Sequence, residues 1–291
     1  MFTKKLLIFA CIAAVALSSL ACGFTVNVPI TTDIKTGPTV TEDILVLDPD
    51  PNAETLDVSL SFGAGELTIN PGAEALIEGT ATYNVEDLKP EVKTQSGWVE
   101  LNTGNLEING IPNFDERLKN NWDLQFGARP INLKISGGAY IGNLELGGLA
   151  LNGLRITDGA AEVHVNFAEP NPQVMDLFRY ETGASTVVLK NLGNANFRSL
   201  IFKGGEGSYE LDFGGDLQED ATVMIETGLS SLIVSVPDNL NVRVHVDSGL
   251  SNISTQGSWG QSGGAYTHQG DGPELDVTIK MGAGNLTLEA Q

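Results

Sequence analysis

The sequence predicts an all-β fold, a right-handed β-solenoid built from about eight repeats that are each punctuated by a glycine. Two nearly identical lines lie far apart in the chain, "SFGAGELTINP" from Ser61 to Pro71 and "KMGAGNLTLEA" from Lys280 to Ala290. Segments such as "INLKI", "AEVHVNF" and "NVRVHV" alternate apolar and polar residues, which is the period of a β-strand. Related lines recur at a nearly constant step, which is typical of stacked repeats.

Each repeat has an apolar residue, a glycine three positions later, and in most cases apolar residues four and six positions after the glycine. Glycine permits a turn or a close backbone approach that every repeat needs. The alternating apolar side chains are expected to share one core, because a single repeat cannot bury its apolar face alone. The predicted inward residues include Leu67, Val163, Val187, Leu232 and Leu286. The repeat glycines are Gly63, Gly138, Gly159, Gly183, Gly205, Gly228, Gly249 and Gly282, with steps of 21 to 24 residues from Gly138 to Gly249.

An antiparallel β-sandwich is the alternative architecture, in which each glycine would lie at a hairpin tip. A solenoid requires the strand after Gly183 to pair in parallel with the strand after Gly205, whereas a sandwich does not. The two "GAG" lines are expected to be the terminal members of the stack, with Gly63 and Gly282 in conformations that alanine tolerates poorly. The Gly138 repeat is predicted to carry a two-residue insertion before Leu144.

The N-terminal segment "MFTKKLLIFACIAAVALSSLAC" has a basic start and a short apolar stretch, which is typical of a secretory signal peptide at residues 1–21. Its end resembles the lipobox of bacterial lipoproteins, in which the cysteine is acylated, although Ser19 stands where that pattern usually has leucine. Cys22 is therefore the predicted lipidation site. Residues 22–54 are rich in Thr, Pro and Asp and predict a flexible tether, with the repeat domain at 55–291.

The chain is strongly acidic, with 16 Lys and Arg against 37 Asp and Glu and a formal net charge of −21. This charge argues against nucleic acid and against electrostatic docking on anionic lipid. Cleavage before Cys22 would remove Cys11 and leave one cysteine, so no disulfide within the mature chain is expected.

Two irregular stretches are expected to cover the ends of the stack. Residues 255–272 carry Trp259 and Tyr266 around a Ser-Gly-Gly turn and predict a hairpin cap. The alternative is a ligand-contacting loop, because exposed aromatic side chains bind sugars or partners. The stretch "IPNFDERLKNNWDLQFGARP", which contains Trp122, predicts a short helix or loop over the other end.

No catalytic, metal or cofactor site is predicted. His164 and His245 lie at outward positions of alternating strands and at different distances from their glycines, so they are not expected to converge on a metal. The segment "GGEGSYELD" lacks an aspartate at the spacing of calcium-binding repeats, and no GxSxG motif occurs. Asp212 and Asp216, candidates for a carboxylate pair, are surrounded by glycine.

The line "VSLSFGAGELTINPGAEALIEGTATYNVEDLKPEV" resembles the N-terminal part of toast-rack family proteins, a bacterial family of unknown function. The segments "YETGASTVVLKNLGNANF" and "IETGLSSLIVSVPDNLNVRV" resemble the glycine-punctuated repeats of that family and of related adhesin-like proteins. The resemblance covers about Leu56 to Glu289. It implies an all-β extracytoplasmic domain and brings no catalytic motif with it.

These features together predict a lipid-anchored protein on the extracytoplasmic face of the cell membrane. Its expected role is a non-catalytic structural, adhesive or envelope-sensing module, and not an enzyme. The expected partners are the membrane, through the anchor, and an envelope protein or glycan. The alternative function is a carbohydrate-binding or carbohydrate-active envelope protein that uses the aromatic loop and outward carboxylates.

Overall fold

The structure, a computed structural model, describes residues 32–33, 36–104, 112–113 and 118–291. The predicted signal peptide and Cys22 lie outside the described residues. Contacts divide the chain into two units. The smaller unit is described only by one parallel pair of short strands, β1 (Thr32–Asp33) and β7 (Pro112–Asn113). Among the described residues, no helix combines the length and the apolar character needed to cross a membrane.

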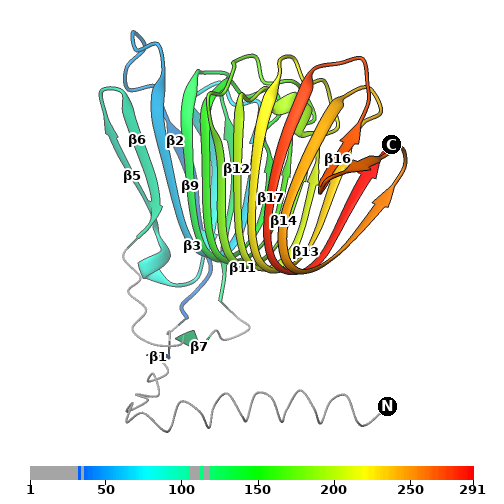
Figure 1. Cartoon of the computed structure of the whole chain (residues 1–291). Coiled ribbons are helices and arrows are strands. Elements are labelled where there is room, and N and C mark those ends of the chain that lie inside the picture. Colours follow the sequence, from blue (N-terminus) through cyan, green and yellow to red (C-terminus); the bar gives the residue numbers. More distant parts are fainter. Residues whose placement is uncertain (1–31, 34–35, 105–111, 114–117) are drawn as a thin grey trace, which may run out of the picture. The chain divides into compact units, whose positions relative to one another are not determined.

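Eight strands of 13 to 17 residues dominate the described part of the larger unit (Figure 1). They are β3 (Leu56–Pro71), β9 (Ile131–Glu145), β10 (Leu151–Asn166), β11 (Phe178–Lys190), β12 (Ser199–Asp212), β13 (Ala221–Val236), β14 (Asn241–Gln256) and β17 (Glu274–Ala290). A short 3₁₀ helix, η3 (Leu192–Ala195), joins β11 to β12.

Neighbouring long strands pair in parallel and in register. Val187 of β11 lies opposite Tyr209 of β12, so the strand after Gly183 pairs in parallel with the strand after Gly205. This pairing confirms the solenoid-like stack of repeats and excludes the antiparallel sandwich. The sheet is open, and it runs from β15 (Gly260–Ser262) at one end to β2 (Val40–Val46) at the other.

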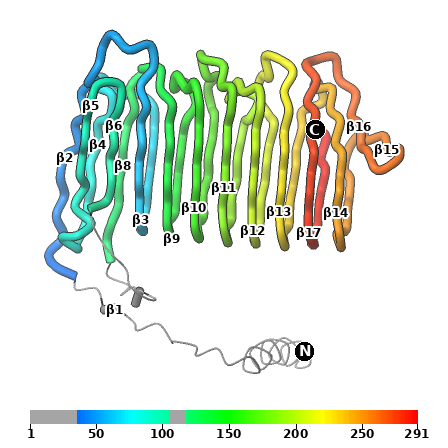
Figure 2. Tube along the Cα trace, turned by 60° about the vertical axis from the view of Figure 1, so that its left-hand side comes forward, coloured from blue at the N-terminus to red at the C-terminus, as the bar shows by residue number. Residues whose placement is uncertain are grey.

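Each long strand bends along its length and so contributes to two layers (Figures 1 and 2). The burial pattern shows the bend. Around Gly159, Ile156 lies three residues before the glycine and Val163 four residues after it, and both are fully buried. The inward face therefore changes from even-numbered to odd-numbered residues at Gly159, which a straight strand of period two cannot do.

The bends stack the repeat glycines on one another. A Cβ atom at Gly205 would lie 2.6 Å from the carbonyl oxygen of Gly183, and one at Gly228 would lie 2.8 Å from that of Gly205. Side-chain carbons do not approach carbonyl oxygens so closely, so these interior bends require glycine. The same holds for Gly282, whose Cβ would lie 2.8 Å from the carbonyl oxygen of Gly228.

Gly63 differs from the other repeat glycines, and the expectation that alanine is poorly tolerated there is wrong. A Cβ at Gly63 would meet only the Thr103 hydroxyl, at an ordinary 3.5 Å. The second glycine of that line carries the constraint instead. Gly65 has a φ of 128°, and its Cβ would collide with the carbonyl oxygen of Asn120.

The order of the repeats in the stack differs from their order in the chain. β17 pairs in parallel with β13 on one side and with β14 on the other. Figure 2 shows the red β17 between these two strands. The "GAG" line of β17 is therefore the penultimate long strand rather than a terminal one, contrary to the expectation from the sequence. The long step after Gly249 is the return connection that makes this insertion possible.

Additional strands cover β3 at the other end of the stack, so β3 is not terminal either. Its first half pairs with β6 (Trp98–Thr103), which forms a hairpin with β5 (Pro90–Gln95). Its second half pairs with β8 (Asn120–Phe126), followed by β4 (Ile77–Tyr83) and β2 (Val40–Val46). A 3₁₀ turn, η2 (Glu86–Leu88), lies between β4 and β5.

The stretch around Trp122 forms strand β8 instead of the predicted helix or loop. Trp122, Leu124 and Phe126 alternate with exposed polar residues and are almost fully buried. Trp122 packs edge-on against Phe62, with ring centroids 5.3 Å apart. This burial covers the end of the core, as expected, and it requires the period of a strand.

The predicted tether at 22–54 also extends too far, because Val40–Val46 form strand β2. Ile44 and Val46 are buried on a strand that pairs with β4, whereas its exposed positions are Thr41, Asp43 and Leu45. Glu42 accepts hydrogen bonds from Lys89, at 2.8 Å, and from the Tyr83 hydroxyl. The acidic composition of this stretch concealed an alternating strand.

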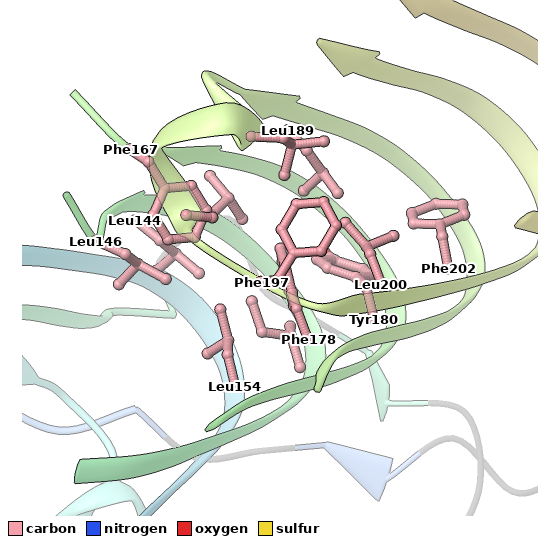
Figure 3. Close-up of a cluster of buried hydrophobic side chains, with 14 of the residues drawn as sticks. Leu144, Leu146, Leu154, Phe167, Phe178, Tyr180, Leu189, Phe197, Leu200 and Phe202 are labelled. Atoms are coloured by element: carbon pink, nitrogen blue, oxygen red, sulfur yellow. The ribbon is translucent and has the colours of Figure 1, made fainter. Parts of the chain in front are cut away.

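The core fills the space between the two layers (Figure 3). The inward residues predicted from the repeat are each at most 1% exposed: Leu67, Val163, Val187, Leu232 and Leu286. The Gly138 repeat contains no insertion, because Gly142 lies opposite Val163 and occupies the inward position itself. The ring of Tyr140 packs where the missing side chain would be.

Candidate binding groove

The three histidines do not form a site. Among the described residues, no group of three or more His, Cys, Asp or Glu side chains is placed to hold a metal ion. His164 lies on the outer face, 3.7 Å from Glu162, and His245 is exposed on β14. The ring nitrogens of His268 instead contact the backbone carbonyl oxygens of Ser258 and Asp238.

The residues Trp259 and Tyr266 belong to the hairpin of β15 (Gly260–Ser262) and β16 (Ala265–His268), which extends the sheet beyond β14. Tyr266 is 7% exposed, and its hydroxyl accepts a hydrogen bond from Gln261. Trp259 is half-buried, donates to the carbonyl oxygen of Gln256, and lies 5.8 Å from the His268 ring. The hollow beside Trp259 is lined by no carboxylate. These contacts favour the cap over the ligand loop.

A buried carboxyl group lies inside the bends. Asp158 accepts hydrogen bonds from the Tyr140 hydroxyl, at 2.7 Å, and from the Tyr180 hydroxyl. Burial raises the pKa of Asp158, and the two hydrogen bonds oppose that rise. Burial and the neighbouring carboxylate also raise the pKa of both tyrosines. The core encloses this cluster, so its role is structural.

The substitution Asp158→Asn is expected to change the pH dependence of stability. Because the folded pKa of Asp158 lies above its unfolded value near 3.8, its contribution to stability is fully present below that value and is lost as pH rises through the folded pKa. The variant should therefore gain stability relative to wild type between pH 4 and pH 7. The free energy of unfolding of the variant minus that of wild type, measured by urea denaturation, should be larger at pH 7 than at pH 4. The exposed Asp271→Asn is the control, and an equal difference at both pH values for Asp158→Asn would contradict the prediction.

One surface hollow, of about 570 Å³, lies along the bends of β11 to β14 and β17. Its charged residues occupy one row across the strands and alternate in sign. Lys203 lies 2.6 Å from Glu226, and their hydrogen bond holds the pKa of Glu226 below its ordinary value. Because adjacent charges in this row compensate one another, the row braces the bends and offers little to a charged ligand. The row comprises Glu181, Lys203, Glu226, Lys280 and Asp247.

A second hollow, of about 450 Å³, has a different character, and we call it the Trp98 groove. It lies on the outward face of the first layer, across β6, β3, β9, β10 and β11. Gly153 leaves part of the groove open, because glycine has no side chain. Asn132 lies beside it on β9, and Leu177 lies just before β11. Leu177 is 39% exposed, so an apolar side chain forms one wall.

Trp98 forms the opposite wall and is held by a tight hairpin. Ser96 and Gly97 connect β5 to β6, and Gly97 adopts a φ of 76° that suits a two-residue turn. The Ser96 hydroxyl donates to Asp50 at 2.6 Å, and the backbone NH of Asp57 donates to the Gly97 carbonyl at 2.9 Å. The indole is half-buried at the start of β6, opposite Asp57. The aromatic wall is therefore fixed before any ligand arrives.

The loop that receives this hairpin is itself anchored. Arg129 donates from Nε to the Asp48 carboxylate at 3.0 Å and from Nη2 to the carbonyl oxygen of Asp50 at 3.2 Å. The hydrogen bond from Ser96 lowers the pKa of Asp50, which keeps this acceptor ionised.

Three cations line one side of the Trp98 groove. Lys134, Arg155 and Arg179 occupy equivalent positions on the successive parallel strands β9, β10 and β11. Neighbouring members of this row are therefore about 4.8 Å apart at the backbone. In a chain with 16 cationic and 37 acidic side chains, such a row is a local reversal of the surface charge.

The cations differ in how strongly they are engaged. Arg155 Nη2 donates to Glu181 at 2.7 Å, and Arg179 binds the other oxygen of the same carboxylate. The hydrogen bond from Arg179 is the main reason why the pKa of Glu181 is lowered. Lys134 forms no ion pair within the described part of the chain, and the buried Nε of Arg179 has no hydrogen-bond partner there. The Glu181 carboxylate thus accepts hydrogen bonds from two guanidinium groups, and the row retains N–H donors that a ligand can engage.

No motif in the sequence predicts the Trp98 groove. Its signal becomes visible when the repeats are aligned on their glycines, because all three cations lie four positions before a repeat glycine. Trp98 lies outside every repeat, in the β5–β6 hairpin, so no periodicity marks it.

A family model described as the N-terminal domain of toast_rack, DUF2154, matches residues 33–177. The chain belongs to the toast-rack family. No curated protein matches the sequence. The matched toast-rack domain contains Trp98, Lys134 and Arg155 and ends just before Arg179, so it holds most of the groove.

Several solved structures are similar to this toast-rack protein. A candidate cell adhesion protein of Clostridium sporogenes has 19% identity and a TM-score of 0.49, over 87% of this chain and 100% of that one. A candidate adhesin of Bacteroides fragilis has 11% identity and a TM-score of 0.47, over 88% and 99%. A candidate lipid binding protein of Parabacteroides distasonis has 12% identity and a TM-score of 0.39, over 89% and 99%. At these identities and scores the likenesses carry no inference about what the toast-rack chain binds.

Proposed function

We propose that this toast-rack protein is a lipid-anchored adhesive module on the extracytoplasmic face of the membrane, which binds a polymer of the cell envelope without chemical turnover. The Trp98 groove is the observation that carries this proposal. It combines a fixed aromatic wall, an apolar wall and a row of cations on a sheet with an otherwise acidic surface. Aromatic and arginine side chains are the residue types that dominate binding surfaces.

The rigidity of the stack supports binding rather than catalysis. The floor of the groove is a sheet in which each strand is hydrogen-bonded to neighbours on both sides, as β3 is between β6 and β9. A preformed surface of this kind binds without a large ordering cost. Arg155 and Arg179 lie beside a carboxylate that is already paired to them, which suits holding an anionic group better than transferring a proton.

Substituting Cys22 with alanine is expected to move the protein from the membrane fraction to the soluble fraction after cell fractionation. The reason is that stable anchoring needs more than one acyl chain, and acylation of this cysteine would supply them. Cys11→Ala is the matched control and should remain with the membrane. Equal membrane retention of Cys22→Ala and wild type would contradict the lipid anchor, while leaving the groove untouched.

Removing the aromatic wall with Trp98→Ala is expected to weaken binding to purified peptidoglycan sacculi at least about tenfold, as for a central tryptophan of a binding surface. The measurement is co-sedimentation of the full-length chain, carried in phosphatidylcholine vesicles, with sacculi. Trp259→Ala is the matched control and should bind as wild type does.

Three results of this experiment would contradict the proposal. Absence of wild-type binding would remove the envelope polymer as the partner. Loss of binding in Trp259→Ala but not in Trp98→Ala would place the contact at the cap hairpin. Release of soluble fragments from the sacculi would show turnover.

A further inference from the structure

We infer that the Trp98 groove recognises a short carboxylated sugar chain that lies across the strands, with its acidic groups along the row of Lys134, Arg155 and Arg179. This inference rests on the proposed function and names the ligand class for the same groove. It follows from four properties of the groove.

The spacing of the cations requires a ligand with repeated charge. The three side chains project from adjacent parallel strands, so the row repeats at the strand separation of about 4.8 Å. That separation is close to the length of one sugar residue in an extended chain. A carboxylated sugar chain that lies along the row therefore presents more than one acidic group to it, whereas a single small anion would engage only one or two cations.

The acidic side chain in the groove limits how much charge the ligand can carry. Asp57 lies on the same outward row as Asn132 and accepts a hydrogen bond from its amide at 2.8 Å. Glu181 occupies the far side of the two arginines. These carboxylates would repel a dense polyanion, such as nucleic acid, and they can accept hydrogen bonds from hydroxyl groups. A ligand with spaced carboxylates and many hydroxyls satisfies both conditions.

The paired backbone of the floor excludes recognition through main-chain hydrogen bonds. Over Asp57 to Ser61, β3 pairs with β6 on one side and with β9 on the other. An extended peptide that adds a strand needs an unpaired edge, which this floor does not offer. Recognition by side chains alone suits a sugar chain better than a peptide.

The walls of the groove provide the remaining contacts. Trp98 presents an indole that can stack on the apolar face of one sugar ring, and Gly153, three strands away on β10, leaves room for another part of the chain. Leu177 closes the other side with exposed apolar surface. The volume of about 450 Å³ suits a chain of two or three sugar residues.

The test compares tri-galacturonic acid with its methyl ester, by isothermal titration calorimetry on the full-length lipidated chain. The two probes have the same sugar skeleton, and only the acid carries charge. We expect the acid to bind at least tenfold more tightly than the ester, with weaker binding as the salt concentration rises. Equal binding of acid and ester would overturn the role of the cations, and absence of binding by both would overturn the ligand class.

Variants separate the groove from the rest of the surface. Lys134→Gln and Arg155→Gln should each weaken binding of the acid about tenfold or more, since each removes a charge-assisted hydrogen bond. Arg155→Lys should lose less than Arg155→Gln. Lys190→Gln is the matched control, because Lys190 is an exposed cation of β11 in the other layer. If Lys190→Gln weakens binding as much as Arg155→Gln does, the interaction is unspecific attraction to cations and the inference fails.

The outcomes of this test and of the sacculus experiment are distinguishable. Binding of sacculi that depends on Trp98, without binding of either trisaccharide, overturns the ligand class and leaves the adhesive function in place. Binding of the acidic trisaccharide without binding of sacculi overturns the envelope partner and supports the ligand class.

Discussion

Gly284→Ala is expected to lower the free energy of unfolding by more than about 3 kcal/mol, because it combines backbone strain with a collision. Gly284 has a φ of 135°, a conformation that residues with a side chain rarely adopt. An added Cβ would also collide with the carbonyl oxygen of Ser230 on the adjacent strand β13. β17 lies between β13 and β14, so it cannot move away from one neighbour without approaching the other.

Urea denaturation of two further variants separates the two causes. Gly263→Ala, at the tip of the cap hairpin, has a φ of 58° and no atom within 4 Å of the added carbon, so it should cost only about 1 kcal/mol of conformational strain. Gly63→Ala has neither strain nor collision and should change stability by less than about 1 kcal/mol. A loss for Gly284→Ala no larger than that for Gly263→Ala would show that the collision is relieved without cost.

Asn171→Ala is expected to destabilise the protein by about 4 kcal/mol, because it removes the four hydrogen bonds that the buried amide makes to backbone groups. Asn171 is 2% exposed in the connection between β10 and β11. Its Oδ1 atom accepts hydrogen bonds from the NH groups of Leu151, at 3.0 Å, and Gln173, at 3.1 Å. Its Nδ2 group donates to the carbonyl oxygens of Leu151, at 2.9 Å, and Ala195, at 3.2 Å.

This side chain therefore links three successive connections of the stack, which no apolar replacement can do. The matched control is Asn143→Ala, because Asn143 is an exposed outward residue of β9 and should cost less than about 0.5 kcal/mol. Both losses are measured by urea denaturation. If Asn171→Ala costs no more than the control, water replaces the amide in the connection and the predicted cost is wrong.

The repeat pattern was sufficient to predict the stack, because each repeat carries its own strand, bend and inward residues. The glycine offset by itself identified the parallel pairing of β11 with β12 and the burial of Val187 and Leu232. The order of the strands in the stack could not be predicted, because no single repeat contains that information. β17 has the same local pattern as its neighbours, so nothing in its sequence states that it pairs with both β13 and β14.

The end strands were missed for a different reason. The acidic pair Glu42 and Asp43 made β2 look like part of a tether, and the acidic and amide residues at the outward positions of β8 made it look like a loop. Their burial depends on the uncovered end of β3 and β4, which is a property of the folded stack. The Trp98 groove likewise exists only after stacking, because its cations come from three repeats and its indole from a hairpin outside them.

Because β17 lies between β13 and β14, this end of the protein can fold only after the last strand of the chain has been synthesised. Until residues 274–290 have been synthesised, β13 presents an unpaired edge and β14 has no long neighbour to join. The long strands before β14 can pair in the order in which they are synthesised, but β14 has no long strand to pair with until β17 follows it. A chain interrupted before Glu274 would expose two open edges that invite pairing with other chains. The same arrangement places residues 274–290 between two paired strands, so hydrogen bonds on both sides protect this segment from proteases.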